Sequence, residues 1–190
     1  FDWERRAQES TNDYGMWVFG DAHDTWDPSD RHWVVHRTWI NTHHGSPRVP
    51  WLLYARSGDP KYVAYARRKA YRCMDLGFCH YTTREFEGLA YPAQKIKGAL
   101  CDYKGLVPWN SGGRLFDYNC MADFMLYTYY ALGDRRGLDV LGEWTEAAVE
   151  QFSRPSTGRP GSAVLATLLA TYQHTWDHRL LPMIESYAAA

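Results

Sequence analysis

One helical punctuation pattern occurs twice in this 190-residue chain and constrains its fold more than any other feature. Residues 51–70 and 124–144 each read as an aromatic-rich helix that ends at Gly-Asp, where a second helix begins at once. A weaker third copy covers residues 165–187. Such helix pairs bury an apolar stripe only against their neighbours. The chain is therefore predicted to be all-α, with stacked helical hairpins that form a partial (α/α) toroid.

Residues 1–190 are expected to form a single domain in which the toroid is truncated, because a closed toroid takes about twice as many helices. Residues 1–30 contain Gly15, Gly20 and many polar groups and predict an irregular segment. Residues 77–116 lack periodicity, and so long a loop in a compact helical protein usually carries function. The chain begins at Phe1 without a signal peptide, so we expect further domains of a longer parent protein as partners.

A further helix is expected near the N-terminus. The Asp-Pro-Ser-Asp sequence at 27–30 offers N-cap chemistry, and the helix would carry Trp33 and Ile40 and end near Asn41. His32 and His36 would then lie one turn apart, a spacing that can hold zinc. The glutamate of the HExxH motif is missing, so a packed pair of histidines is the preferred interpretation.

Capping residues define the hairpins. Ser46 and Pro47 suit the N-cap and first position of the first hairpin, and Gly58 suits the end of its first helix. The second hairpin is expected at about residues 117–152, with the Gly-Arg-Pro-Gly sequence at 158–161 separating it from the third. Further predicted positions are the C-cap Gly133, the cap Asp177, and a buried stripe of Val63, Ala66, Ala70 and Met74.

Charge and hydropathy argue against two classes of partner. The net charge of −1 argues against nucleic acid, and no window approaches the ~20 apolar residues of a membrane span. The one basic run is predicted to be a solvated helix face. It consists of Arg67, Arg68, Lys69 and Arg72.

The cysteines and aromatic residues leave alternatives open. No CxxC pair or zinc-ribbon spacing is present. Cys73 and Cys79 can bridge in an oxidising compartment, whereas buried thiols are the alternative for these two, Cys101 and Cys120. The chain has nine Trp and fourteen Tyr, more than a core needs. Such rings serve either as stacking platforms for sugars or as filler between helices.

The densest candidate site is the junction at residues 39–45, which leads into the first hairpin. Asn41 offers an amide donor, and His43 and His44 offer bases that titrate near neutral pH. The alternative is that both histidines cap the helix or satisfy loop carbonyls.

The segment at residues 20–27 mixes carboxylates, His23 and Trp26 with glycine hinges, and acid–base chemistry fits it. Its aspartates, with Asp21 first, are also calcium-type donors, but the spacing of an EF-hand is missing. No metal or other cofactor is therefore expected, with calcium as the alternative.

Two further groups lie in the 77–116 stretch and just after it. His80, Tyr81 and Arg84 combine proton carriers with a group that clamps carboxylates. Trp109 offers a stacking ring near a second cluster of polar groups. That cluster consists of Asn110, Arg114 and Tyr118.

Three segments resemble the helical toroid of the exo-rhamnogalacturonan lyase and YetA-like family of polysaccharide lyases. They are GDAHDTWD at 20–27, TWINTHHG at 38–45 and LLYARSGDPKY at 52–62. The resemblance covers most of the chain but only part of the family's architecture, whose β-rich regions are not seen here. It implies β-elimination in a uronate-containing, rhamnogalacturonan-like pectic polysaccharide.

The candidate residues supply the groups that this elimination needs. The uronate carboxylate must be neutralised, a base must take the C5 proton, and an acid must protonate the leaving oxygen. The expected catalytic set is Asn41, His43, His44, Tyr81, Arg84 and Tyr118. The expected substrate-binding set is Asp21, His23, Trp26, Trp39, His80, Trp109, Asn110 and Arg114.

Two other functions stay open. A glycoside hydrolase on the same toroid would use two carboxylic acids, Asp21 or Asp24 with Glu85 or Glu87. A non-catalytic helical-repeat scaffold would bind a protein partner instead. A polymeric substrate favours an extracellular or periplasmic location over a cytoplasmic one, although imported oligosaccharides fit the residues equally well.

Overall fold

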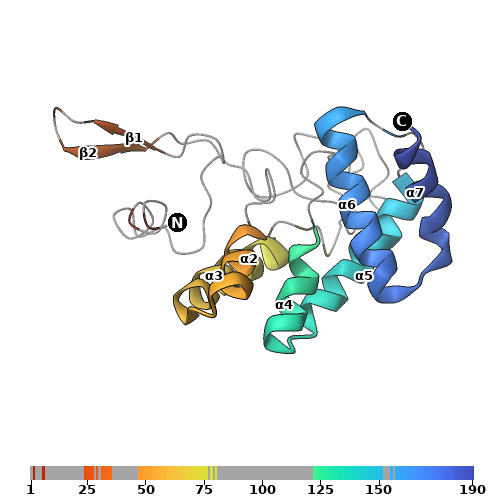
Figure 1. Cartoon of the computed structure of the whole chain (residues 1–190), viewed down its shortest axis with the longest axis horizontal. Coiled ribbons are helices and arrows are strands. Elements are labelled where there is room, and N and C mark those ends of the chain that lie inside the picture. The colour runs from red at the N-terminus through yellow and green to blue at the C-terminus, as the bar shows by residue number, and fades with distance from the viewer. Residues whose placement is uncertain are drawn as a thin grey trace.

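The computed structural model describes residues 24–27, 31–35, 47–76, 122–151 and 157–190, together with positions 2, 6, 29, 78, 80 and 155. This part of the chain is mostly helical, which confirms the all-α prediction in its coarse form. Each of its helices is too short or too polar to cross a lipid bilayer. Three helix pairs follow one another along the molecule (Figure 1).

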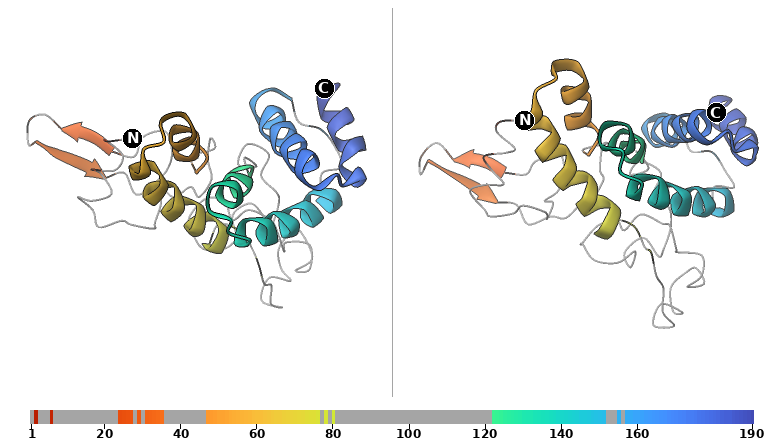
Figure 2. Two further views of the ribbon diagram at one scale, coloured as in Figure 1. Left: turned by 60° about the horizontal axis from the view of Figure 1, so that its bottom comes forward. Right: turned by 90° about the horizontal axis from the view of Figure 1, so that it is seen from below.

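The pairs are formed by consecutive helices. In the first, α2 (Val49–Ser57) packs against α3 (Pro60–Leu76), and in the second, α4 (Phe124–Leu132) packs against α5 (Arg136–Gln151). In the third, α6 (Gly158–Thr175) leads through the 3-10 turn η5 (His178–Leu180) into α7 (Leu181–Ala188). Figure 2 shows the same succession from two further directions.

A β-hairpin lies where a helix is predicted. Strands β1 (Asp24–Asp27) and β2 (His32–Val35) pair antiparallel, with Trp26 opposite Trp33 in the register. The helix predicted after residue 30 is therefore wrong at its start. Because His32 lies in a strand, the helical one-turn spacing that a zinc site at His32 would need is also absent. The physical reason is the Trp-Val-Val sequence, because aromatic and β-branched residues favour strands over helices. Residues 1–30 are likewise not wholly irregular, since they include β1.

The same turn joins the two helices of every pair. The residue after the first helix adopts the left-handed conformation and donates its N–H to a tyrosine carbonyl four residues earlier, at 2.7, 2.7 and 2.8 Å. The next residue is an aspartate whose carboxylate accepts the N–H two residues on, at 2.9, 2.9 and 3.0 Å. The turns are Tyr54–Gly58–Asp59–Lys61, Tyr129–Gly133–Asp134–Arg136 and Tyr172–Trp176–Asp177–Arg179.

These turns confirm the predicted caps at Gly58 and Gly133. Asp177, predicted to cap the final helix, instead caps the 3-10 turn η5, and the N-cap of the final helix α7 is Leu180. The helix starts are less accurate. Helix α2 begins at Val49 with Arg48 as its N-cap and Pro50 in its first turn, so Ser46 and Pro47 do not have the predicted roles. Residues 158–161 form the first turn of α6 instead of a separator.

Trp176 occupies the position that Gly58 and Gly133 hold in the other turns. Its φ of 56° lies in the left-handed region, which costs a residue with a side chain roughly 1 kcal/mol or more. The side chain is 67% exposed and meets only the edge of the Tyr172 ring among the ring contacts of the described residues. The fold therefore gains little from this tryptophan.

Replacing Trp176 with Gly is expected to raise the free energy of unfolding by up to about 1 kcal/mol, because glycine adopts positive φ without strain. Urea unfolding measures the change. The matched control is Trp176→Ala, which removes the same ring but keeps the strain and should be less stable than Trp176→Gly. Equal stability of the two variants would contradict the argument.

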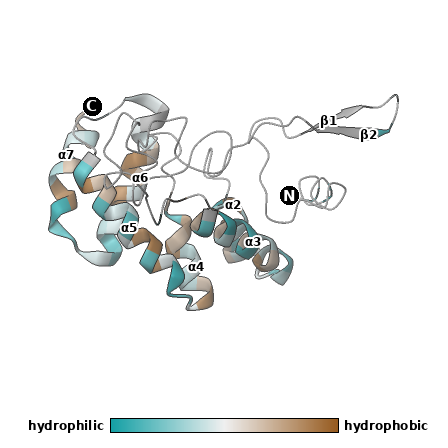
Figure 3. Cartoon of the chain, turned by 180° about the vertical axis from the view of Figure 1, so that it is seen from behind, coloured by the Kyte–Doolittle hydropathy of each residue, from teal (hydrophilic) through white to brown (hydrophobic). Residues whose placement is uncertain are grey.

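One apolar core runs through the three pairs. The predicted stripe on α3 is confirmed, since Ala66, Ala70 and Met74 are fully buried and Val63 packs against the core. Figure 3 shows hydrophobic segments recurring along α4, α5 and α6. The largest fully buried side chains are Trp144, Phe124, Met74, Met125, Leu141, Leu168, Leu180, Val140 and Val164.

The basic run on α3 is only half solvated. Arg67 and Arg68 are exposed as predicted, but Lys69 and Arg72 are buried, so the predicted face is wrong for these two. The reason is helical geometry, which turns successive residues by about 100° and brings Lys69 and Arg72 onto the stripe of buried Tyr65. The Lys69 ammonium lies 5.1 Å from the centre of the Tyr65 ring.

Cys73 is a buried thiol on the same helix, which confirms the thiol alternative for this residue. Burial raises its pKa to about 12, because the thiolate would lose its hydration. Cys79, Cys101 and Cys120 lie outside the described residues.

Ion pairs connect each helix pair to the one before it. Arg136, from the second turn, contacts Asp75 near the end of α3 at 3.0 Å. Arg179, from the third turn, contacts Glu146 of α5 at 2.7 Å. In both cases the basic residue of a turn reaches back to the second helix of the preceding pair.

Candidate functional site

The predicted site residues fall mostly on parts of the chain that the structure does not describe. His80 is the one whose side chain is described, and the backbone of Trp26 lies in β1. The remaining predicted residues lie outside the described ranges. They are Asp21, His23, Trp39, Asn41, His43, His44, Tyr81, Arg84, Trp109, Asn110, Arg114 and Tyr118.

His80 is held between two acceptors. Its Nδ1 lies 2.5 Å from the Glu143 carboxylate, and its Nε2 lies 2.5 Å from the backbone carbonyl of Met74. An imidazole N–H donates to a carboxylate or a carbonyl oxygen, and the tautomer decides which of these two contacts is the donated one.

A second ion pair lies beside this histidine. The Nε and Nη2 atoms of Arg136 donate to Asp75 at 3.1 and 3.0 Å, and Nη2 is 3.3 Å from the Nε2 of His80. This contact places the Arg136 guanidinium beside the imidazole, with Asp75 on the guanidinium and Glu143 on the imidazole. His80, Arg136, Asp75 and Glu143 are called the His80 cluster below.

The four side chains of the His80 cluster differ in how much of their surface is exposed to solvent. The side chains of His80 and Glu143 are 24% and 26% exposed, whereas those of Arg136 and Asp75 are 38% and 50% exposed. Solvent therefore weakens the outer pair more than the inner one. An incoming anion meets Arg136 and Asp75 first.

Local sequence explains how the cluster is assembled. Arg136 and Glu143 are seven residues apart on α5, two turns along one helix face. Beyond the end of α3, the buried ring of Phe78 anchors the chain and leads to His80. The imidazole then contacts the Met74 carbonyl, in the last turn of α3.

Sequence reasoning missed Asp75, Arg136 and Glu143. A signal for Arg136 exists in the repeated turn, where a basic residue follows the aspartate by two positions. Glu143 is 63 residues from His80, so no local pattern connects them.

Metal ligands are not assembled in the part of the chain that is described. Among those residues, no three His, Cys, Asp or Glu side chains converge as ligands would. The side chains of the aspartates considered for calcium lie outside that part. Comparison with protein-family models, with curated proteins and with solved structures gives no match to this chain.

Proposed function

We propose that this protein is a polysaccharide lyase that cleaves uronate-containing pectic polysaccharide by β-elimination on a helical (α/α) toroid. The observation that carries the proposal is the His80 cluster, where the Arg136 guanidinium lies beside an imidazole near the surface. Such a pair suits recognition of a sugar carboxylate, the group that must be neutralised before the C5 proton can leave.

Arg136 is the cluster member best suited to contact the substrate. Its Nε and Nη2 atoms are engaged, while Nη1 has no hydrogen bond within the described part of the chain. A uronate carboxylate would bind there in competition with Asp75, the more exposed of the two carboxylates. His80 acts as a positioning residue, since both its ring nitrogens are occupied.

The elimination itself would be completed by the residues of the sequence-based hypothesis. A base among His43, His44 and Tyr81 takes the C5 proton. The bond between C4 and its leaving oxygen breaks, a double bond forms between C4 and C5, and an acid protonates the released oxygen. Asn41 and Arg84 stabilise the enolate-like charge that precedes the break.

Replacing Arg136 with Met is expected to lower kcat/KM on a uronate polymer by about ten-fold or more, because a charge-assisted contact is lost. The loss should lie mainly in KM, since the carboxylate is bound in the ground state as well as in the transition state. The measurement is the ultraviolet absorbance of the unsaturated product, with the full chain incubated with rhamnogalacturonan and other uronate polymers.

The matched control is Arg135→Met, which changes the exposed neighbour in the same turn and should leave kcat/KM unchanged. Equal activity of Arg136→Met and the unaltered protein would remove Arg136 from the site. New reducing ends without ultraviolet absorbance would replace elimination with hydrolysis.

A helical-repeat scaffold that binds a protein partner is the second candidate, favoured by the ion pairs that fasten successive helix pairs. Absence of both absorbance and reducing ends on every polymer would support it.

A further inference from the structure

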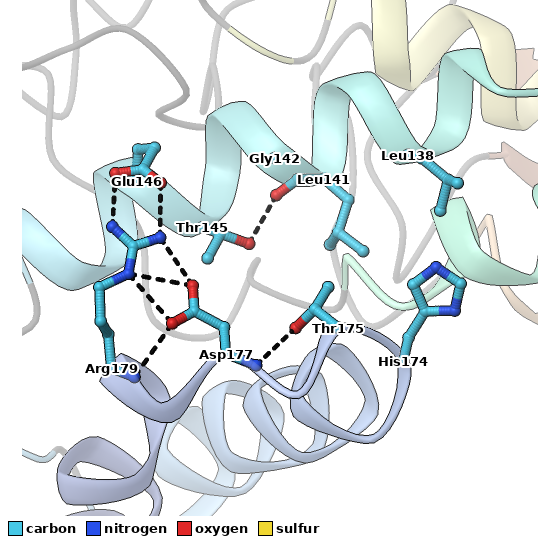
Figure 4. A pocket seen from close by; sticks show the side chains of 9 residues that line it. All are labelled: Leu138, Leu141, Gly142, Thr145, Glu146, His174, Thr175, Asp177 and Arg179. Carbon is cyan, nitrogen blue, oxygen red and sulfur yellow. Dashed lines mark hydrogen bonds and ion pairs between the residues drawn. The ribbon is translucent and has the colours of Figure 1, made fainter.

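A groove separates α5 from the end of α6 and the turn that follows it (Figure 4). It encloses about 260 Å³. Leu138, Leu141 and Thr145 line it from α5, and His174 and Asp177 line it from the other side. The groove is separate from the His80 cluster and includes none of its residues.

One end of the groove is charged. Arg179 donates to both oxygens of Glu146 at 3.0 and 2.7 Å, and to the carboxylate of Asp177 at 2.6 to 3.0 Å. These hydrogen bonds to Arg179 hold the pKa of each carboxyl below its ordinary value, so both stay ionised at neutral pH. Two carboxylates against one guanidinium leave this end with an excess negative charge.

The other end is formed by rings and aliphatic groups. In Figure 4 the imidazole of His174 points towards Leu138, away from the charged end. Its Nδ1 is 2.9 Å from the hydroxyl of Tyr130, and its ring meets those of Tyr129 and Tyr130 edge-on at 5.7 and 5.6 Å. The imidazole is thereby fixed in place as one wall.

Gly142 keeps the middle of the groove open. It lies inside α5, where glycine costs about 1 kcal/mol relative to alanine. No atom lies within 4 Å of the position that its Cβ would occupy, so packing does not require a glycine here. A larger side chain at this position would extend into the groove.

We propose that this groove binds one neutral sugar residue. The volume lies just below the roughly 300–1,000 Å³ of pockets for drug-sized ligands, so it suits nothing larger than a single ring. Carboxylates fixed by an arginine can accept hydrogen bonds from neighbouring hydroxyl groups, while Leu138 and Leu141 meet the apolar face of the ring. The excess negative charge disfavours a uronate.

The choice of a sugar rests on the carbohydrate-directed function proposed above, whereas the groove exists independently of it. The test therefore measures binding and not cleavage. The full chain, labelled at leucine methyl groups, is titrated with the methyl glycosides of glucose, galactose and mannose, and with methyl glucuronoside as the charged counterpart.

At least one neutral glycoside is expected to shift the methyl signals of Leu138 and Leu141 saturably, and the uronate should bind about ten-fold more weakly or worse. Gly142→Leu should weaken binding by about ten-fold or more, because its side chain fills the groove. Gly142→Ala is the control and should retain the affinity. Both substitutions introduce better helix formers at an exposed position, so folding is not threatened.

Three results would each overturn the proposal: no saturable shift with any neutral glycoside, equal or tighter binding of the uronate, or unchanged affinity in Gly142→Leu. Retained elimination activity in Arg136→Met together with intact sugar binding would overturn the role of the His80 cluster alone. The two proposals therefore fail separately.

Discussion

Replacing Arg48 with Met is expected to lower the free energy of unfolding by about 3 kcal/mol at neutral pH. Arg48 lies 3.3 Å from Asp123, whose side chain is only 5% exposed. Methionine keeps the aliphatic part of the arginine and removes the charge, so the Asp123 carboxylate loses its counterion inside the protein. Urea unfolding of the two proteins measures the difference.

The size of this effect should depend on pH. Burial raises the pKa of Asp123 above its ordinary value of 3.8, and the charge of Arg48 opposes the rise. A raised carboxyl pKa means that the folded state binds the proton more tightly, so ionisation costs stability as pH rises through that pKa. The penalty of Arg48→Met is therefore full at neutral pH and shrinks as pH falls towards 3.8.

The control is the double variant Arg48→Met with Asp123→Asn, in which no charge is left buried. It should recover much of the lost stability at neutral pH. A penalty for Arg48→Met that is the same in acid and at neutral pH would contradict the role assigned to Asp123.

Replacing Gly137 with Ala is expected to lower the free energy of unfolding by about 1–3 kcal/mol, as overpacking does. A Cβ on Gly137 would overlap the backbone carbonyl oxygen of Met125, where α5 packs against α4. Backbone cannot move aside as a flexible side chain can, so the two helices must separate. Urea unfolding gives the change from the midpoint at constant m.

Gly142→Ala, on the same helix, is expected to change the free energy of unfolding in the opposite direction. Its new methyl group meets nothing within 4 Å, and alanine is the better helix former, so stability should rise by up to about 1 kcal/mol. Equal effects of Gly137→Ala and Gly142→Ala would show that helix propensity, not contact with Met125, governs both positions.

The helix pairs could be predicted because their signals are local. Gly58 and Gly133 end helices through a backbone conformation that glycine adopts freely, and the Val63–Met74 stripe follows from helical period alone. The third turn was harder to recognise because Trp176 replaces the glycine. Its aspartate and the basic residue two positions on are what preserve the geometry.

The rest depends on contacts between distant segments. The partner of His80 lies on α5, 63 residues further along the chain. The N-terminal helix was predicted from capping residues, while strand propensity in the residues after Arg31 outweighed them. Within the candidate site, the sequence predicted His80 but none of the groups that contact its ring.

The turn arginines form ion pairs with helices that precede them in the chain, and this has a consequence for synthesis on the ribosome. Arg136 contacts Asp75 and Arg179 contacts Glu146, and both carboxylates lie on helices that have already been translated. Each new pair can therefore dock as soon as its turn leaves the exit tunnel, without waiting for later sequence. Folding of this region can proceed vectorially, with nascent chains arrested after successive pairs showing stepwise gains in protease resistance.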